Sequence, residues 1–286
     1  MRKIGFIGYG AMGSIMLRAL LDSGALSQNQ VIVFNRTPEK LKDFRKKYRR
    51  VEVAKSLAVL APKCERIFIC TATSAVKEVL NAIQPYLPED IHIISITGTI
   101  EIKCLENIFS GSITKIIPTQ IAEVGEGVTL VCHNKRVLAK DKKFIRDIFA
   151  SLGRVKELKE SQLDLAADLS SCAPAFHAAI LNNFAEMAKK HGKLTPEEIN
   201  EIVIPTAYGT MKLLLEQNIS FTGLINRVAT LGGITEEGVK VLNQELPRVF
   251  DKILTVTLAK RASVKKRMRR QYGLDSETEA CITSTT

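Results

Sequence analysis

Three glycines near the N-terminus have the spacing of a dinucleotide-binding loop. The stretch GYGAMG, residues 8–13, fits the pattern G-x-G-x-x-G. It follows an apolar run typical of a buried strand and precedes a helical pattern over residues 11–23. In that setting the glycines permit a tight turn, a close approach of backbone to a pyrophosphate, and tight helix–strand packing. A glycine turn without a ligand is the alternative. The context favours a dinucleotide site with the phosphates at the helix N-terminus, formed by Gly8, Gly10, Ala11, Met12 and Gly13.

The end of the second expected strand bears on which dinucleotide is bound. A site for NAD carries an acidic residue there, about 20 residues beyond the loop, to bond the ribose 2′-hydroxyl. This chain instead has Asn35, Arg36 and Thr37. The planar guanidinium of Arg36 suits a 2′-phosphate, and its neighbours can donate hydrogen bonds. The sequence therefore predicts NADP(H) in preference to NAD(H), although a surface arginine beside a helix cap explains the same residues.

Two short hydroxyl-bearing loops follow later strands. Thr71 and Ala72 come after the strand that ends near residue 70, and Thr97 and Gly98 come after the next one. Ligands of doubly wound sheets bind outside the carboxyl ends of the strands. We therefore expect both loops to lie along the cofactor, with plain turn chemistry as the alternative.

The order of the elements indicates the fold. Apolar strand patterns alternate with helical patterns up to about residue 158, which predicts an α/β, Rossmann-type, doubly wound, mostly parallel sheet. Helical periodicity then prevails over residues 159–272, with a last helix expected to begin at Pro247. The polar end, residues 273–286, has the composition of a disordered tail. We therefore predict a nucleotide-binding domain, an all-helical domain and a tail.

Composition narrows the functional class. With 45% hydrophobic and 25% charged residues the chain is typical of a globular protein. It has no apolar run of the roughly 20 residues that a membrane helix needs. The first apolar segment contains glycines and lacks a signal-peptidase cleavage site, so we expect it to be a buried strand rather than a signal peptide. We therefore expect the protein to be cytoplasmic. The six cysteines and four histidines lack metal-ligand spacing, so no metal is expected.

The net charge of +11 comes largely from one segment. Seven lysines and arginines and no acid lie between Lys260 and Arg270, and without them the charge would be +4. Because the excess is local, a nucleic-acid-binding face is not indicated. We expect a solvated helix end, whose dipole favours cations; an acidic partner and nucleic acid are the less favoured alternatives.

Two segments of the helical half contain small and polar residues that the packing of amphipathic helices does not by itself require. LSSCAPAF, residues 169–176, places small residues at a helix start. TLGGITEEG, residues 230–238, places a glycine pair and Thr235 before another helix. Backbone N–H groups at such a start form a cradle for a carboxylate. An ordinary loop with a capping threonine is the alternative.

Together these motifs resemble the pyrroline-5-carboxylate reductase family, up to about residue 258. IGFIGYGAMG is similar to the family's nucleotide loop, LSSCAPAF to its L-S-G-S-x-P-A-Y segment, and TLGGITEEG to its S-P-G-G-x-T segment. The resemblance implies that Thr235 bonds the imine nitrogen and that Cys172 stands in the place of a serine near the substrate. It also implies a carboxylate site that involves Thr230, Gly232, Gly233 and Ile234.

The resemblance further implies a function and an assembly. The function is NADPH-dependent reduction of 1-pyrroline-5-carboxylate to L-proline, and the assembly is a homodimer, or a higher oligomer, formed through the helical domain. The family's Val-Lys-Pro is Cys70-Thr71-Ala72 here, and its M-P-N-T-P is Ile117-Pro118-Thr119-Gln120-Ile121. These departures indicate a divergent bacterial member, with a competence-operon branch as one placement. A different NADP-dependent oxidoreductase and a non-catalytic NADP-binding paralogue are the alternatives.

Overall fold

The chain forms two compact units. The computed structural model describes residues 2–275. Within them, residues 2–172 and 257–275 make up the first unit, and residues 173–256 make up the second. The chain therefore leaves the first unit after Cys172 and returns to it at Thr257.

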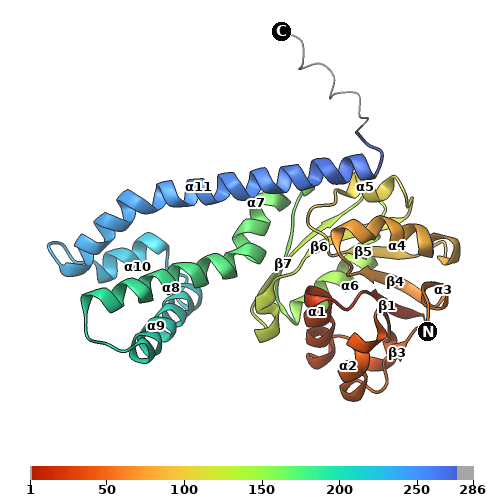
Figure 1. The fold of residues 1–286 in the computed structure, drawn as a ribbon, viewed down its shortest axis with the longest axis horizontal. Coiled ribbons are helices and arrows are strands. Elements are labelled where there is room, and N and C mark those ends of the chain that lie inside the picture. Colours follow the sequence, from red (N-terminus) through yellow and green to blue (C-terminus); the bar gives the residue numbers. More distant parts are fainter. Residues whose placement is uncertain (1, 276–286) are drawn as a thin grey trace, which may run out of the picture. The chain divides into compact units, whose positions relative to one another are not determined.

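The first unit is built on an eight-stranded sheet (Figure 1). Its order is β3-β2-β1-β4-β5-β6-β7-β8, with all neighbouring strands parallel except the antiparallel pair β6 and β7. The strand order reverses between β1 and β4, the position where such sheets bind their ligands. The strands are β1 (Lys3–Ile7), β2 (Val31–Phe34), β3 (Glu52–Val53), β4 (Cys64–Ile69), β5 (His92–Ser95), β6 (Ser112–Ile117), β7 (Gly127–His133) and β8 (Gly153–Glu157).

Helices supply the apolar surface that the strands bury. Successive side chains of a strand point to opposite faces, so Phe6 of β1 belongs to one buried cluster and Ile7 to another. Leu17 of α1 packs in the first cluster and Leu80 of α4 in the second. The predicted Rossmann-type sheet is therefore confirmed. The helices of this part are α1 (Ala11–Asp22), α2 (Lys42–Lys47), α3 (Leu57–Leu60), α4 (Val76–Ile83), α5 (Ile102–Glu106), α6 (Ala139–Ala150), α7 (Leu163–Ala167) and a π-helical turn, Asp168–Cys172.

The end of α11 (Ile234–Gln271) completes the first unit. Met268 and, just beyond the helix, Tyr272 are buried in the same cluster as Leu80. The Asn107 side chain donates a hydrogen bond to the carbonyl of Tyr272 at 2.8 Å. Residues 257–275 are therefore part of the Rossmann core.

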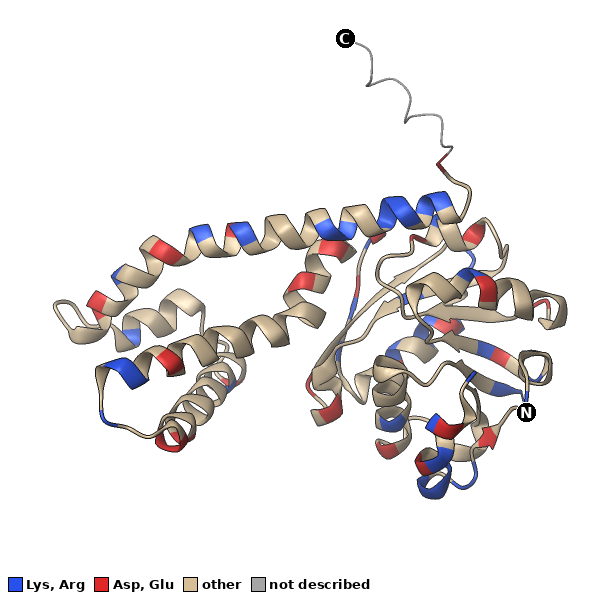
Figure 2. Cartoon of the chain, viewed as in Figure 1, with Lys and Arg blue, Asp and Glu red and all other residues tan. Residues whose placement is uncertain are grey.

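The expectation of a solvated basic helix end was wrong for three of its seven cations. Arg261, Lys265 and Arg269 form ion pairs with carboxylates of the first unit (Figure 2 shows the concentration of blue at this end of α11). The charge run alone could not reveal these pairs, because the acids lie about 100 residues or more away in the sequence. Arg267 and Lys266 are exposed, as expected of a solvated helix face.

The second unit is all helical. It consists of α8 (Ala173–His191), α9 (Pro196–Glu216), α10 (Phe221–Val228) and α11 up to residue 256. Thr195 and Glu198 form the predicted capping box at the start of α9. The expected helix start at Pro247 was wrong, since α11 continues through this proline. Proline fits the first turn of a helix, which is why a start was expected there; inside a helix it costs one hydrogen bond and some strain, and α11 accommodates it.

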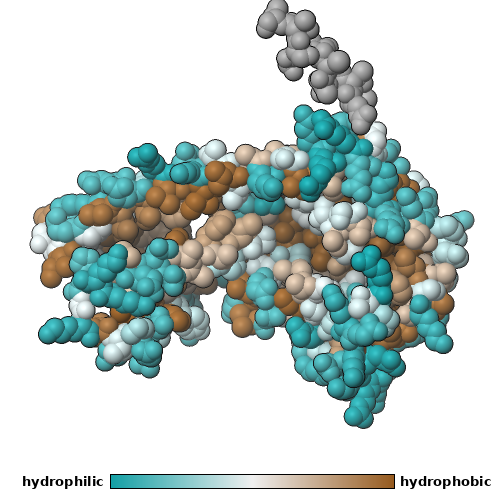
Figure 3. Space-filling model, in the orientation of Figure 1, coloured by the Kyte–Doolittle hydropathy of each residue, from teal (hydrophilic) through white to brown (hydrophobic). Residues whose placement is uncertain are grey.

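Few side chains of the second unit are buried. Only Ala173, Ala185 and Ile199 are buried among its described residues. Large apolar side chains instead remain exposed on all four helices, Phe184, Tyr208, Phe221 and Phe250 among them. Figure 3 shows apolar surface over these helices.

The units differ from the domains expected from sequence periodicity. The sequence pattern predicts a boundary near residue 158, where strands give way to helices. However, Leu163 and Ala167 of α7 are buried in a cluster with Ile117 and Leu130, so α7 belongs with the sheet. Of the tail expected at residues 273–286, residues 276–286 lie outside the described part of the chain. No helix within residues 2–275 is long and apolar enough to cross a membrane.

Candidate functional site

The glycine loop has the conformation that the pattern predicted. Gly8 has φ +103°, and a Cβ at this position would lie 2.7 Å from the Cys70 carbonyl oxygen. A Cβ on Gly13 would lie 2.8 Å from the Cβ of Cys70, so this glycine lets α1 pack against the end of β4. A Cβ on Gly10 would meet nothing within 4 Å. The open side of the loop is therefore at Gly10, next to the helix N-terminus.

The N-terminus of α1 is free to bind an anion. Gly10 is its N-cap residue and supplies no side-chain hydrogen bond, and the first turn contains no acid. The first backbone N–H groups of a helix have no partner within the helix, and the helix dipole adds positive potential there. Ala11 and Met12 occupy this turn, so they would offer backbone N–H groups to an anion rather than polar side chains.

Asn35 holds two loops together. Its Oδ1 accepts a hydrogen bond from the Tyr9 N–H at 2.9 Å, and its Nδ2 donates to the Thr37 carbonyl at 2.7 Å. The side chain therefore positions the glycine loop against the end of β2, a role that the sequence did not indicate. Arg36 beside it is exposed and forms no ion pair within the described chain.

A cavity of about 390 Å³ brings the two loops together with the loop after β4. Its volume lies within the range of small-molecule sites. Seven of the predicted cofactor residues line it: Gly8, Gly10, Asn35, Arg36, Thr37, Thr71 and Ala72. We refer to it as the cofactor cavity. Ala11, Met12, Gly13, Thr97 and Gly98 are not among its lining residues.

Thr71 gives the cofactor cavity an unused polar group. Its hydroxyl oxygen is buried and has no hydrogen-bond partner among the described residues. Burying a hydroxyl without a partner costs free energy, so this group is available to a ligand in the cavity that it lines.

Sequence reasoning missed the apolar wall of the cofactor cavity. Ala75, Val79 and Ala82 of the α4 region line it, together with Leu57. The spacing of the first three, at intervals of four and three residues, is that of one helix face. The signal was therefore present in the sequence, but ordinary packing explains the same spacing. Glu78 is the acidic residue of the lining.

The loop after β5 lies outside this cavity. Thr97 is buried, and its hydroxyl is 3.0 Å from that of Ser95. A Cβ on Gly98 would lie 3.8 Å from Nη1 of Arg261. The expected cofactor contacts of Thr97 and Gly98 therefore stay a prediction, since neither residue lines the cofactor cavity.

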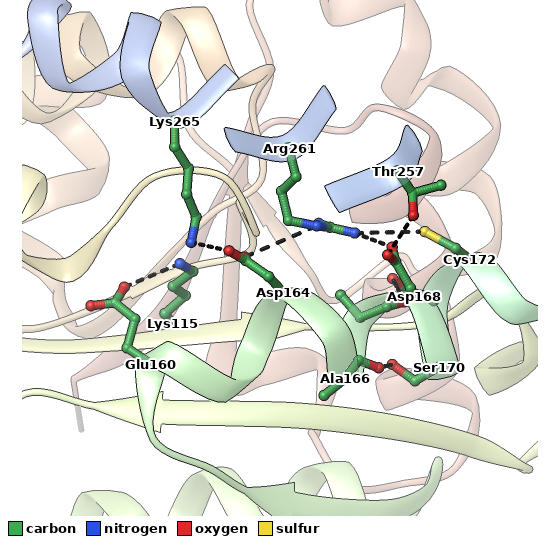
Figure 4. A network of polar contacts seen from close by, with 12 residues as sticks. Lys115, Glu160, Asp164, Ala166, Asp168, Ser170, Cys172, Thr257, Arg261 and Lys265 are labelled. Atoms are coloured by element: carbon green, nitrogen blue, oxygen red, sulfur yellow. Dashed lines mark hydrogen bonds and ion pairs between the residues drawn. The ribbon is translucent and has the colours of Figure 1, made fainter. Parts of the chain in front are cut away.

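A buried polar network surrounds the π-helical turn of the first unit (Figure 4). The fully buried carboxylate of Asp168 accepts hydrogen bonds from Nη2 of Arg261 at 2.6 Å and from the Thr257 hydroxyl at 2.7 Å. Nη2 of Arg261 also lies 3.9 Å from the sulfur of Cys172. The predicted substrate residue Cys172 is thus adjacent to a cation held by a carboxylate.

The second half of this network lies near the start of α7 and the turn before it. Lys265 pairs with Asp164 at 2.5 Å, and Lys115 pairs with Glu160 at 3.1 Å. The side chain of Lys115 is completely buried, and this burial lowers the pKa of its ammonium group, an effect that Glu160 opposes. The network therefore compensates charges inside the first unit.

The predicted substrate segment lies in the second unit, between α10 and α11. Gly232 has φ +73°, and a Cβ on Gly233 would lie 2.7 Å from the Thr230 hydroxyl oxygen, so both positions require glycine. The N–H of Gly232 donates to the carboxylate of Glu236 at 2.7 Å, and the N–H of Gly233 donates to the Thr230 carbonyl at 2.9 Å. Two of the expected cradle groups are thus already paired.

Thr235 lies in the first turn of α11 and is exposed. Ile234 beside it is 94% exposed. The segment and Cys172 belong to different units. Within residues 2–275 no group of three or more His, Cys, Asp or Glu residues is arranged to hold a metal ion.

The fold and the loop geometry define a Rossmann-type dinucleotide-binding protein with an added helical unit. Profile comparisons agree with both parts. The profile described as "NADP oxidoreductase coenzyme F420-dependent" matches residues 3–98, and that described as "Pyrroline-5-carboxylate reductase dimerisation" matches residues 160–264.

Individual relatives identify the family. "Pyrroline-5-carboxylate reductase 3" of Bacillus subtilis is 35% identical over 95% of this chain and 100% of its own length. "ComE operon protein 4" of the same organism is 27% identical over 94% and 99%. The NADP-bound pyrroline carboxylate reductase of Plasmodium falciparum has a TM-score of 0.78 at 27% identity, over 93% of this chain and 98% of that one. The chain belongs to the pyrroline-5-carboxylate reductase family. The higher identity to the reductase does not favour a competence-operon placement.

Proposed function

We propose that the protein reduces the cyclic imine 1-pyrroline-5-carboxylate to L-proline with NADPH as hydride donor. The observation that carries this proposal is the 35% identity to a curated reductase across that protein's full length. In the reaction the carbon of the protonated imine gains a hydride, so the ring nitrogen, which already carries a proton taken from solvent, becomes a secondary amine and NADPH becomes NADP⁺. The nicotinamide supplies the hydride, so the protein has to supply position and electrostatics.

The cofactor cavity fits an NADP-type dinucleotide. Gly10 leaves room for a pyrophosphate at the N-terminus of α1, and the unpaired Thr71 hydroxyl can bond a ribose or phosphate oxygen. Arg36, which lines the cavity without a carboxylate partner, is the proposed contact of the 2′-phosphate. The preference for NADPH over NADH is part of the proposal.

Thr235 is the proposed catalytic residue. Its hydroxyl would hold the ring nitrogen so that the imine carbon faces the cofactor, and proximity supplies much of the rate. The backbone of Gly232, Gly233 and Ile234 would bind the substrate carboxylate. Because Glu236 now accepts the Gly232 N–H, its carboxylate must give up this contact when the substrate carboxylate takes it.

A homodimer completes this proposal. The second unit leaves most of its large apolar side chains exposed and has almost no buried core of its own. Such helices need another apolar surface, and the match to a dimerisation profile over residues 160–264 indicates a second copy of the chain.

One observation supports a non-catalytic paralogue as the second candidate. The family's asparagine after β6 is replaced by Thr119, which is fully buried, and its hydroxyl donates to the Ser170 carbonyl at 3.4 Å. This side chain is thus turned into the protein. A chain with this change could keep NADPH binding and lack turnover.

The decisive assay follows NADPH absorbance with 1-pyrroline-5-carboxylate. We expect turnover by the parent protein, and a decrease of about 100-fold in kcat/KM for Thr235→Ala. Thr222→Ala, at another exposed threonine in the first turn of a helix of the same unit, is the matched control and should leave turnover unchanged. Intact NADPH binding without turnover by the parent would favour the paralogue instead.

A further inference from the structure

A second cavity adjoins the cofactor cavity at the end of β2. It has a volume of about 720 Å³ and shares Phe34, Asn35 and Arg36 with the cofactor cavity. Its other lining residues come from the turn before α2, from α2 itself, from the segment after α2, and from the end of β3 with the two residues that follow it. The shared wall is at the strand end where the adenosine ribose lies in sheets of this type. We refer to it as the basic cavity.

Among the described residues, four cations and no carboxylate line the basic cavity. They are Arg36, Arg45, Arg49 and Lys55. None of them forms an ion pair with a described residue, whereas the neighbouring Lys46 and Lys47 pair with Asp43 and Asp22. Like charges around one concave surface reinforce each other's potential. The cavity is therefore a positive site that lacks its counter-charge.

The wall that carries these cations is well packed. Leu41, Tyr48 and Val51 line the cavity and are buried. The Tyr48 hydroxyl donates to Asp22 at 2.9 Å, which fixes the ring. The Phe44 ring packs in tilted contact with those of Tyr9 and Tyr48, with centroids 5.0 and 4.8 Å away. The glycine loop and the wall of the basic cavity are thus held in one cluster of rings.

We propose that the basic cavity receives the 2′-phosphate of NADP(H), and that Arg45, Arg49 and Lys55 act with Arg36 to set the preference over NAD(H). This inference rests on the proposed use of NADP(H) as cofactor. A phosphomonoester carries up to two negative charges, and arginine binds it through two parallel hydrogen bonds. NAD(H) has only a hydroxyl at this position, so it leaves all four cations without a partner.

The test uses ligands that differ only in this phosphate. Binding of 2′,5′-ADP and of 5′-AMP is measured by calorimetry for the parent and for Arg45→Ala, Arg49→Ala and Lys55→Ala. Each substitution should weaken 2′,5′-ADP about fivefold, the effect of one solvent-screened charge contact, and leave 5′-AMP unchanged. Arg50→Ala is the matched control, because Arg50 does not line the basic cavity.

The outcomes separate this inference from the proposed function. If the parent binds 2′,5′-ADP no more tightly than 5′-AMP, the proposed NADP(H) preference fails and this inference fails with it. If the parent prefers 2′,5′-ADP and only Arg36→Ala reduces that preference, the inference is overturned while the proposed function stands. Inorganic phosphate should compete with 2′,5′-ADP; phosphate that binds together with it would show a separate phosphate site and also overturn the inference.

Discussion

Replacing Arg261 by methionine tests whether the buried network stabilises the first unit. The Asp168 carboxylate is completely buried, with Arg261 as its cation and the Thr257 hydroxyl as its other hydrogen-bond donor. Arg261→Met keeps much of the apolar side chain and removes the charge. It therefore leaves a buried carboxylate without a cation, far from the water that would solvate it.

The cost follows from that unpaired charge. Removing one partner of a buried ion pair destabilises a protein by about 3–5 kcal/mol. Since domains are stable by only about 5–15 kcal/mol, we expect a large decrease in the urea midpoint, measured by far-UV circular dichroism. The matched control is Arg267→Met, six residues further along α11 on an exposed position without an ion pair among the described residues.

A double substitution separates charge from packing. Asp168→Leu together with Arg261→Met removes both charges, so it should cost less than Arg261→Met alone, because replacing a buried pair by apolar side chains is often close to neutral. If Arg261→Met unfolds at the same urea concentration as Arg267→Met, the reasoning is refuted. A double variant less stable than the single one would equally contradict it.

Three further predictions concern other parts of the first unit. Ending the chain at residue 258 removes Met268 and Tyr272 from the core and Arg261 from the buried Asp168, so the free energy of unfolding should fall by more than roughly 5 kcal/mol. A truncated chain with an unchanged melting temperature would contradict this. Burial lowers the pKa of His92 from 6.5 to about 4, so between pH 6.5 and 4 the unfolded chain binds more protons than the folded one. The free energy of unfolding should therefore fall by up to about 3 kcal/mol on acidification through this range. His92→Phe should flatten this part of the pH profile. Gly8→Ala places a Cβ 2.7 Å from a carbonyl oxygen and should weaken NADPH binding more than about tenfold, whereas Gly24→Ala, also at a positive φ but with nothing within 4 Å, should leave binding unchanged in the same titration.

The fold of the first unit was largely predictable from sequence. Its strands are short apolar runs whose ends are marked by glycines, polar loops and helix caps, and these local signals identify a strand without knowledge of its neighbours. The glycine loop was predictable for the same reason, because the turn at Gly8 and the close packing at Gly13 are local requirements. The resemblance to the reductases rests on short motifs of this kind and was confirmed.

The rest depends on contacts between distant residues. Asn35 has a side chain and a sequence position suited to a cofactor contact, but this side chain instead forms hydrogen bonds to the backbone of Tyr9 and Thr37. Arg261 looked like a solvated cation because its partner Asp168 lies 93 residues earlier. The charge and periodicity of a segment indicate its own secondary structure and exposure. They do not indicate which distant segment will pack against it in the folded protein.

The return of the chain at Thr257 has a consequence for how the protein is made. The Rossmann unit is interrupted by residues 173–256 and completed by residues up to 275. A ribosome synthesises the chain from the N-terminus, and most domains can fold as soon as they emerge. Here the sheet emerges first, but Met268 and Tyr272 of its core are among the last described residues to leave the exit tunnel. The nucleotide-binding unit therefore cannot complete its core until residue 272 has been translated, so a nascent chain stalled within residues 173–256 holds an unfinished Rossmann fold.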